Sequence, residues 1–418
     1  MFKGIKKYIN KMRFVLVSTH VDQTTGYSKV VANLLQQVST VPNVKVFHFG
    51  FQRHPSRPGL RTAPKNVIQY DAAANEEPRE EGFGFNKIHE YLETVNPDVV
   101  MIYNDPIIIY KFIEAMKYEK GKSPYKLWIY LDIVYKGTVQ VLVDKINEQV
   151  ERIYMFSESW ADEFRSYSNA SPPIAVMDHA VDSSIFYKLP PSTRSSLRIL
   201  NNIPSDAIVF LNANRNSQRK RIDLSIMGFS ELISRDITKP YYMIIVTATT
   251  PQNGGYYDLV RIYLSELKAR DLDKNEALLK RLIIIDSSST LLKDEKINEI
   301  YNITDIGINT SDGEGFGLCQ LEHLHTGAPQ VVTNVGAYST FLTPAVAEFI
   351  DPIGYSYFPG TMPLGHICPY FDYKMVADAM QRTIDTLDER REAASCHSFK
   401  SWSESCSVWL TDIANETK

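Results

Sequence analysis

The sequence predicts an α/β protein made of two domains of similar size, each built around a parallel β-sheet. Short apolar runs alternate with segments of helical periodicity, and this alternation is typical of βαβ units. The alternation stops once, at a Pro- and Ser-rich run, and then starts again. The chain has 418 residues, which is enough for two or three domains of roughly 100–200 residues each.

The elements of the first domain begin at Arg13–Ser18, whose unbroken apolar character indicates a buried strand. A turn with Gly26 follows, and apolar residues then recur at helical spacing from Val30 to Val38. A helix is also predicted at Phe85–Val95, and further strands are predicted at Val44–Gly50, Pro97–Tyr103, Lys126–Leu131, Arg152–Phe156 and Pro173–Met177.

The run Lys188–Ser196 is rich in Pro, Ser and charge and has no periodicity, so we interpret it as the start of a linker between domains. The βα rhythm restarts after it. Strands are predicted at Ile208–Asn212, Tyr242–Val246, Leu282–Ile285, Ile306–Asn309 and Gln330–Thr333. Helices are predicted at Ile222–Ile233, Leu259–Leu267, Lys296–Tyr301, Phe316–His325 and Met375–Leu387.

Composition excludes several classes of protein. The net charge of -4 argues against an electrostatically driven nucleic-acid binder. The four cysteines, Cys319, Cys368, Cys396 and Cys406, form no CxxC pair. We therefore expect neither a zinc site nor a disulfide framework, and we expect a reducing compartment. The apolar runs are far shorter than the roughly 20 residues that a membrane span needs.

The first twelve residues are basic and do not read as a signal peptide, so a cytoplasmic location is expected. This leader is either a solvated extension or a weak contact with an anionic membrane surface, and membrane contact is at most peripheral. A homodimer is the default expectation for the oligomeric state.

Polar residues suited to a ligand follow three of the predicted strands, where open parallel sheets bind their ligands. Gly26 precedes a helix and either lets backbone approach a phosphate or is a plain turn glycine. Four cations lie between Arg215 and Arg221. They are suited to binding a nucleotide diphosphate, although a solvated charge run is the other reading.

The third segment is a glycine-rich loop that carries Glu314, with Glu322 eight residues further on. Its glycines open backbone N–H groups toward a ligand, and a carboxylate beside them can accept hydrogen bonds from sugar or ribose hydroxyls. An ordinary loop-to-helix cap is the alternative.

The segment from Glu314 to Glu322 resembles the E-x7-E motif of retaining glycosyltransferases of the GT-B fold, family 4. The spacing of Arg215 and Lys220 is similar to the Arg-x4-Lys diphosphate clamp of that family. Three further segments resemble family motifs in the correct order: Asp178–Phe186, Gly327–Ala337 and Phe399–Trp402. The resemblance runs from about Arg13 to Leu410 and includes members encoded by large DNA viruses, in which case the location would be the host cytoplasm.

The resemblance implies two Rossmann-like α/β domains that face a deep cleft. Residues 13–187 would form the acceptor-side domain and residues 206–395 the nucleotide-sugar domain. Residues 396–418 would form a C-terminal helix that crosses back to the first domain.

The resemblance also implies the roles of the site residues. Arg215 and Lys220 would hold the diphosphate, and Gly26 would approach it from the N-terminal domain. Glu314 would contact the transferred sugar and Glu322 the ribose. The base would lie near Ser287–Thr290. The backbone beside Glu314 would complete the nucleotide-sugar site, at Gly315, Phe316, Gly317 and Leu318.

One departure from the family concerns the acceptor side. Family members commonly carry a histidine at the end of a strand of the first domain, where this chain has Asp132. Asp132 either takes over acceptor-side chemistry or caps a loop, with Asp105 and His20 as further candidates. The pair Asp271 and Asp273 lies in a polar run away from any strand end, so we do not expect it to bind a metal.

The function expected from the resemblance is a metal-independent, retaining hexosyltransferase. It would transfer a sugar, with mannose from GDP-mannose as the best choice, from a GDP- or UDP-linked donor to a glycan or glycoprotein hydroxyl. No cofactor is expected, because the nucleotide-sugar is a co-substrate. Two alternatives stay open: a catalytically silent sugar-nucleotide-binding scaffold, and a sugar-nucleotide epimerase on the same fold.

Overall fold

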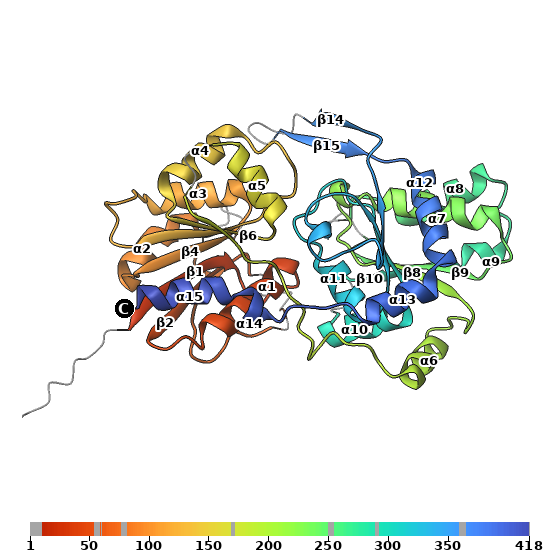
Figure 1. Ribbon diagram of the computed structural model, residues 1–418, viewed down its shortest axis with the longest axis horizontal. Coiled ribbons are helices and arrows are strands. Elements are labelled where there is room, and N and C mark those ends of the chain that lie inside the picture. Colours follow the sequence, from red (N-terminus) through yellow and green to blue (C-terminus); the bar gives the residue numbers. More distant parts are fainter. Residues whose placement is uncertain are drawn as a thin grey trace, which may run out of the picture. The chain divides into compact units, whose positions relative to one another are not determined.

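The computed structural model describes residues 11–53, 59, 61–76, 82–168, 172–249, 255–288, 292–358 and 365–417. These residues form two compact units. Unit 1 consists of two segments of the chain, one up to His179 and one from Trp402 onward. Unit 2 comprises Ala180–Ser401. Each unit is an α/β fold with its own sheet, as the alternation of strands and helices predicted (Figure 1).

Unit 1 contains a parallel sheet with the strand order β3-β2-β1-β4-β5-β6-β7. Its central strand β4 is buried along its whole length, which explains why its sequence is an unbroken apolar run. The strands are β1 (Met12–Thr19), β2 (Val44–Phe51), β3 (Ile68–Asp71), β4 (Val99–Asn104), β5 (Lys126–Leu131), β6 (Arg152–Met155) and β7 (Ile174–Val176).

The helices of unit 1 connect these parallel strands. Side chains cap the first turns of some of them: Thr25 caps α1, and Asp105, followed by Pro106, caps α3. They are α1 (Gly26–Val38), the 3₁₀ turn Ala73–Asn75, α2 (Phe85–Val95), α3 (Pro106–Met116), α4 (Gln140–Gln149) and α5 (Glu158–Ser166).

The end of the chain packs on unit 1 through helices α14 (Trp402–Ser405) and α15 (Ser407–Glu416). The Trp409 ring is fully buried and meets Phe14 of β1 edge-on, with 5.7 Å between ring centroids. Asp412 accepts a hydrogen bond from the Tyr154 hydroxyl at 2.7 Å. The last helix is therefore an integral layer of unit 1.

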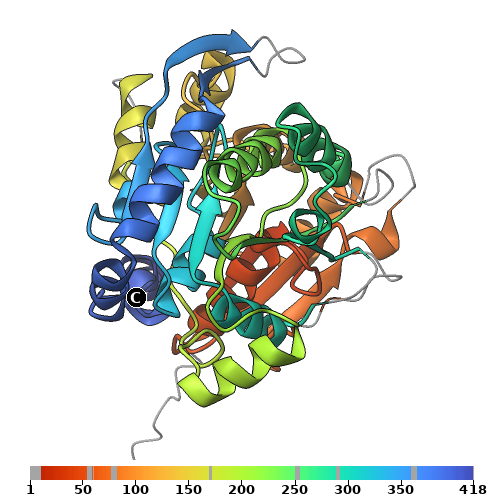
Figure 2. The same cartoon turned by 90° about the vertical axis from the view of Figure 1, so that its right-hand side faces the viewer.

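Unit 2 contains a parallel sheet with the order β10-β9-β8-β11-β12-β13 and a separate antiparallel hairpin, β14-β15. The hairpin is the blue pair of strands at the top of Figure 2. The strands are β8 (Ile208–Asn212), β9 (Tyr241–Thr247), β10 (Leu282–Asp286), β11 (Ile306–Asn309), β12 (Gln330–Thr333), β13 (Ala347–Ile350), β14 (Gly354–Phe358) and β15 (His366–Tyr370).

Helices cover both faces of this sheet. Helices α7, α8 and α12 pack together on one face, and the other face carries α10 and α11, with α6 against α10 and α13 against α11. They are α6 (Pro191–Leu200), the 3₁₀ turn Gln218–Lys220, α7 (Ile222–Arg235), α8 (Leu259–Ala269), α9 (Glu276–Leu279), α10 (Asp294–Ile303), α11 (Leu318–His325), the 3₁₀ turn Tyr338–Thr340, α12 (Tyr373–Asp385) and α13 (Leu387–Ser395).

Both sheets have the strand order 3-2-1-4-5-6 of the doubly wound Rossmann type, with a seventh strand added in unit 1. The prediction of two Rossmann-like α/β domains is therefore confirmed. The predicted boundaries differ from the observed division, which falls after His179 and again before Trp402 rather than at 187, 206 and 396. The deep cleft stays a prediction.

The interpretation of 188–196 as a linker is wrong, because Pro191–Leu200 is helix α6. Proline stands at its first turn, where no intrahelical N–H is needed. Tertiary contacts rather than apolar periodicity hold the helix: Arg194 donates to the Asn302 carbonyl at 2.7 Å, and the buried Arg198 donates to the Ala207 carbonyl at 2.6 Å. A sequence pattern cannot reveal such contacts.

Candidate nucleotide-sugar site

The candidate site lies in unit 2, at the carboxyl ends of β8 and β11. In the observed strand order these two strands are neighbours whose connections leave in opposite directions, and open α/β sheets bind ligands at this switch point. The cationic segment predicted from Arg215 follows β8, and the glycine-rich loop with Glu314 follows β11. Two motifs about 100 residues apart in the sequence are therefore brought together by the topology.

A buried ion pair forms the centre of the site. The Nζ atom of Lys220 donates a hydrogen bond to Oε2 of Glu314, and both residues are buried. Arg219 is the second cation, with its Nη1 atom 3.8 Å from Oε1 of Glu314 and hydrogen-bonded to the Gly313 carbonyl. Burial works to raise the pKa of Glu314, but the two cations outweigh it and hold that pKa below its usual value. The carboxylate is therefore charged.

A layer of amide side chains surrounds this ion pair. The Asn309 Nδ2 atom lies 3.5 Å from Oε2 of Glu314 and donates to Oε1 of Gln320 at 3.0 Å. Asn309 also donates to Asn214 at 3.3 Å, which joins the ends of the two strands. All of these side chains are buried. The network fixes the carboxylate of Glu314 in one orientation, as a binding site requires.

Two glycines allow the backbone of the Glu314 loop to pack closely. Gly336 has φ +63°, and a Cβ atom there would overlap the carbonyl oxygen of Glu314. Gly317 has φ +98° and lies against the Tyr338 ring, where a Cβ atom would overlap the ring. Helix α11 begins at Leu318 rather than at the predicted Phe316, because Gly317 in the left-handed region is its N-cap. The first N–H groups of α11 have no partner within the helix.

Glu322 lies on α11, and its position is fixed by a residue that the sequence did not single out. The Tyr301 hydroxyl of α10 donates to Oε2 of Glu322 at 3.0 Å, and both side chains are buried. The Tyr301 ring is stacked on His323, with 5.2 Å between centroids. Burial raises the pKa of Tyr301 well above its usual value, so the hydroxyl remains a donor.

Among the other predicted residues of the donor site, Gly315 and Phe316 are buried and Leu318 is half-buried, whereas three others are exposed. Arg215 is exposed in the loop after β8, and Ser287 is exposed directly after β10, where its N–H donates to the Thr247 carbonyl at 2.9 Å. Of the predicted base loop 287–290, residues 289 and 290 lie outside the described residues. Gly26 is the exposed first residue of α1 in unit 1.

Asp132 follows β5 in unit 1 and accepts a hydrogen bond from the Tyr27 hydroxyl at 2.5 Å. Burial, together with the nearby carboxylate, raises the pKa of Tyr27 well above its usual value. Asp105 caps helix α3 by accepting from the Ile108 N–H at 3.0 Å. This cap gives Asp105 a structural role. His20 is buried and packs on Gly50, where a Cβ atom would overlap its ring.

In the part of the chain that the structure describes, no group of three or more His, Cys, Asp or Glu side chains could hold a metal ion. Asp271 and Asp273 lie in the turn between α8 and α9. Among the same described residues, no helix is long and apolar enough to cross a bilayer.

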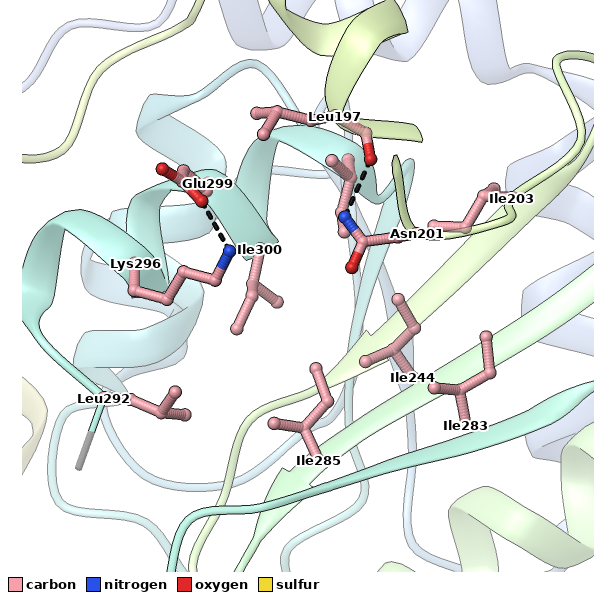
Figure 3. Close-up of a pocket in the computed structure, with 11 residues that line it drawn as sticks. Leu197, Asn201, Ile203, Ile244, Ile283, Ile285, Leu292, Lys296, Glu299 and Ile300 are labelled. Carbon is pink, nitrogen blue, oxygen red and sulfur yellow. Dashed lines mark hydrogen bonds and ion pairs between the residues drawn. The ribbon is translucent and has the colours of Figure 1, made fainter. Parts of the chain in front are cut away.

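A separate cavity of about 120 Å³ lies between α6, α10 and strands β9 and β10 (Figure 3). Its polar rim consists of Asn201 and the ion pair of Lys296 and Glu299, whose charged atoms are 2.7 Å apart. Its other lining residues are aliphatic: Leu197, Ile203, Ile244, Ile283, Ile285, Leu292, Ile300 and Ile303. It contains none of the predicted site residues, so we treat it as distinct from the candidate site.

Sequence reasoning missed three groups of the site: Arg219, Tyr301 and the amide layer around Asn309. A signal existed for Arg219, which belongs to the cationic run, but the family pattern drew attention to Arg215 instead. No sequence signal indicated Tyr301, because its partner is 21 residues away on another helix.

The comparison with family models finds no match. A curated relative, D-inositol 3-phosphate glycosyltransferase 2 of Catenulispora acidiphila, is 24% identical over 226 residues. The match spans 53% of this chain and 46% of the relative, so it covers about half of each protein.

Solved structures resemble the chain over nearly its whole length. Sucrose-phosphate synthase from Thermosynechococcus elongatus has a TM-score of 0.66 at 14% identity, with 97% of each chain covered. Anabaena HepE in complex with UDP-glucose has a TM-score of 0.62 at 13% identity, with 97% of this chain and 98% of that chain covered. An E. coli structure titled trehalose-6-phosphate, bound with UDP-2-fluoro glucose, has a TM-score of 0.63 at 13% identity, with 97% of each chain covered. The likeness shows the fold, two Rossmann-like α/β units as in GT-B glycosyltransferases.

Proposed function

We propose that the protein is a retaining glycosyltransferase that moves a hexose from a nucleotide-sugar to a hydroxyl group of an acceptor. The observation that carries the proposal is the buried pair of Lys220 and Glu314 at the switch point of unit 2, with Arg219 beside it. A buried carboxylate held charged by two cations at a ligand-binding edge is typical of a functional site. The name of the curated relative and the UDP-sugars in the structures of similar fold support the same reading.

The two cations supply the electrostatic part of the proposed mechanism. Lys220 and Arg219 would neutralise the negative charge that grows on the diphosphate as the glycosidic bond breaks. A guanidinium binds a diphosphate through two parallel hydrogen bonds, and a lysine adds a point charge. Arg215, the first residue of the Arg-x4-Lys pattern, is proposed to contact the same diphosphate. These groups would do the work of a metal ion, so we propose that the chemistry is metal-independent.

The carboxylates are proposed to orient the donor. Glu314 would accept hydrogen bonds from hydroxyls of the transferred sugar, while the diphosphate takes its place beside Lys220. Glu322, held by Tyr301, would accept hydrogen bonds from the ribose. The backbone N–H groups of Gly315–Leu318 and of Gly26 would approach the diphosphate, and the base would lie near Ser287. We regard these as assignments to be tested by substitution.

Retention follows in this proposal from attack on the same face of the sugar from which the diphosphate leaves. The departing phosphate oxygen would take the proton of the acceptor hydroxyl, so no carboxylate nucleophile is required. Asp132 would orient the acceptor, with the Tyr27 hydroxyl holding its carboxylate. The acceptor is proposed to be a glycan or a glycoprotein.

Two nucleotide-sugars are candidate donors. The sequence resemblance favours GDP-mannose, whereas two structures of similar fold hold UDP-glucose and UDP-2-fluoro glucose. A cytoplasmic location and an origin in a large DNA virus stay predictions from the sequence, as does a homodimer.

The first experiment measures thermal unfolding with GDP, UDP, GDP-mannose and UDP-glucose, each with magnesium and with EDTA. A ligand at 100 times its Kd adds about 2.7 kcal/mol to the stability of the folded state. Stabilisation by one base in EDTA would identify the donor nucleotide. Stabilisation by none would contradict the assigned site.

The second experiment separates the candidate functions by their products. A transferase releases free nucleotide and glycosylates an acceptor, an epimerase changes the sugar while it stays attached, and a scaffold does neither. Glu314→Gln keeps the shape and removes the charge, so we expect nucleotide release to fall at least about 100-fold. Glu299→Gln, which makes the same change at an exposed glutamate of unit 2, is the matched control.

A further inference from the structure

The hairpin β14-β15 of unit 2 is a second feature of the structure that indicates a binding surface. It forms its own two-stranded sheet and does not pair with the six-stranded sheet (Figure 1). An isolated hairpin is marginally stable in water, and contiguous exposed apolar surface on a protein usually marks a contact site. A partner that covers one face of the hairpin would remove both costs.

The register of the hairpin separates its two faces. Tyr355 is opposite Pro369 and Tyr357 is opposite Ile367, so these residues share one face, which we call the tyrosine face. Both tyrosines are 66% exposed, and Ile367 is 42% exposed. Ile353, which precedes the strand by one residue, is 65% exposed. Six large apolar side chains on or beside this short strand pair are therefore exposed, four of them on or next to the tyrosine face and two, Phe358 and Tyr370, on the opposite face.

The opposite face carries the exposed Phe358 and Tyr370 and one residue that contacts the candidate site. Cys368 lies on that face, and its Sγ atom is 3.4 Å from Oδ2 of Asp312, two residues before Glu314. Burial, with Asp312 beside it, raises the pKa of Cys368 to about 12, so the thiol donates the hydrogen bond. The hairpin is thus attached to the loop that carries the proposed sugar-binding carboxylate.

The Tyr357 ring reaches across the hairpin. A Cβ atom on Gly365 would overlap the Tyr357 hydroxyl, so the tyrosine occupies the space that a side chain at 365 would need. The Tyr357 side chain is 66% exposed all the same, so much of its surface is accessible to a ligand. Tyr355, two residues earlier, places a second ring about 6.6 Å along the same face, which is of the order of the length of one hexose unit.

We propose that the tyrosine face binds a neutral glycan chain, the acceptor of the reaction, by stacking sugar rings on Tyr355 and Tyr357. The inference rests on the proposed glycosyltransferase function, which requires a carbohydrate or similar hydroxyl-bearing partner. A sugar ring has a face of C–H groups that suits an aromatic ring, and hydroxyls at its edge that suit the phenol group. The platform would hold the chain on the hairpin that contacts the Glu314 loop through Cys368 and Asp312.

Charge and shape favour a glycan over the other partners. Strands 354–358 and 366–370 contain no Lys, Arg, Asp or Glu, so they match an uncharged ligand. Contact with an anionic membrane surface is normally supported by lysine and arginine. A tyrosine that crosses its own hairpin, as Tyr357 does, is also poorly placed to insert into lipid.

The test is native affinity electrophoresis in gels that contain dextran, mannan, soluble starch or xyloglucan, without any nucleotide. At least one glycan should retard the wild-type chain. Tyr355→Ala/Tyr357→Ala should raise the Kd for that glycan about tenfold or more, and Tyr355→Trp/Tyr357→Trp should restore binding. Tyr187→Ala is the matched control, since that tyrosine of unit 2 is also exposed but lies outside the hairpin.

The proposal is overturned if no glycan retards the wild-type chain, or if the double alanine variant binds as the wild type does. It is also overturned if the two tyrosines are needed for sedimentation with phosphatidylcholine–phosphatidylglycerol vesicles, or for self-association, and not for glycan binding. Thermal stabilisation by nucleotide is measured in parallel on the same variants. If the proposed function is wrong, nucleotides will not stabilise the wild-type chain. If only the glycan platform is wrong, nucleotides will still stabilise it and the gels alone will show no binding.

Discussion

Asp305 joins helix α6 to the sheet of unit 2, and removal of its charge tests that role. Its side chain is 2% exposed. The Oδ1 atom accepts a hydrogen bond from Arg194 at 2.6 Å and another from Arg391. The Oδ2 atom accepts from the backbone N–H of Val209 at 2.8 Å and lies 3.6 Å from Nη2 of Arg198. Asp305→Asn keeps the size and an acceptor for the N–H but removes the charge.

The magnitude follows from the exposure of the three arginines. The Arg198 side chain is only 6% exposed, and a buried cation that loses its partner costs about 3–5 kcal/mol. Arg194 and Arg391 are 32% and 35% exposed, so each adds at most about 1 kcal/mol. We expect unit 2 to lose about 4 kcal/mol of unfolding free energy. Its Tm should fall by about 8–16 °C for a unit of this size.

Tryptophan makes the assay specific to one unit. The chain has four tryptophans, and all of them belong to unit 1: Trp128, Trp160, Trp402 and Trp409. Urea unfolding followed by tryptophan fluorescence therefore reports on unit 1, while far-UV circular dichroism reports on both units. The transition of unit 2 is therefore the one seen by circular dichroism but not by fluorescence, and Asp305→Asn should move it to lower urea concentration.

A shift of that transition by less than about 1 kcal/mol would refute the reasoning. A second variant tests whether the unpaired Arg198 is the cause. Adding Arg198→Met to Asp305→Asn removes the buried cation and should recover part of the lost unfolding free energy. Glu299→Ala breaks an exposed ion pair between positions i and i+3 of α10 and should cost no more than about 0.5 kcal/mol.

Three further predictions concern the site and pH. Lys220→Met should lower nucleotide release by about 100- to 1,000-fold in a coupled assay, and unchanged release would exclude the lysine from the diphosphate site. Tyr301→Phe should raise the donor KM about tenfold with little change in kcat, whereas a loss confined to stability would make the tyrosine structural. Acid should destabilise the protein through three buried histidines whose pKa values burial lowers from 6.5 to about 3: His48, His179 and His323. Between pH 6.5 and about 3 these histidines bind protons in the unfolded chain but not in the folded chain. As the pH is lowered through this range, the unfolding free energy therefore falls by up to about 1.4 kcal/mol per pH unit for each histidine. His48→Asn should flatten that slope in urea titrations, and an unchanged slope would contradict the assignment.

The two-sheet fold could be predicted because its inner strands are buried on both faces and therefore appear in the sequence as continuous apolar runs. Val99–Asn104 and Ile306–Asn309 are fully buried in this way. Helix α6 could not be predicted, because it is held by Arg194 and Arg198 through contacts with residues elsewhere in unit 2. The hairpin β14-β15 was not predicted either, because its strands are short and do not form a continuous buried apolar run.

The sequence by itself determined which chemical groups this protein possesses: two carboxylates eight residues apart, a cationic run and a loop of glycines. Spacing along the chain reveals such groups because neighbours on one loop or helix stay neighbours after folding. Only the tertiary structure decided which groups meet. It placed Arg219 and Lys220 against Glu314, and it placed the Tyr301 hydroxyl within hydrogen-bond distance of Glu322. Such pairs depend on strand order and helix packing, and these are fixed by contacts between residues far apart in the sequence.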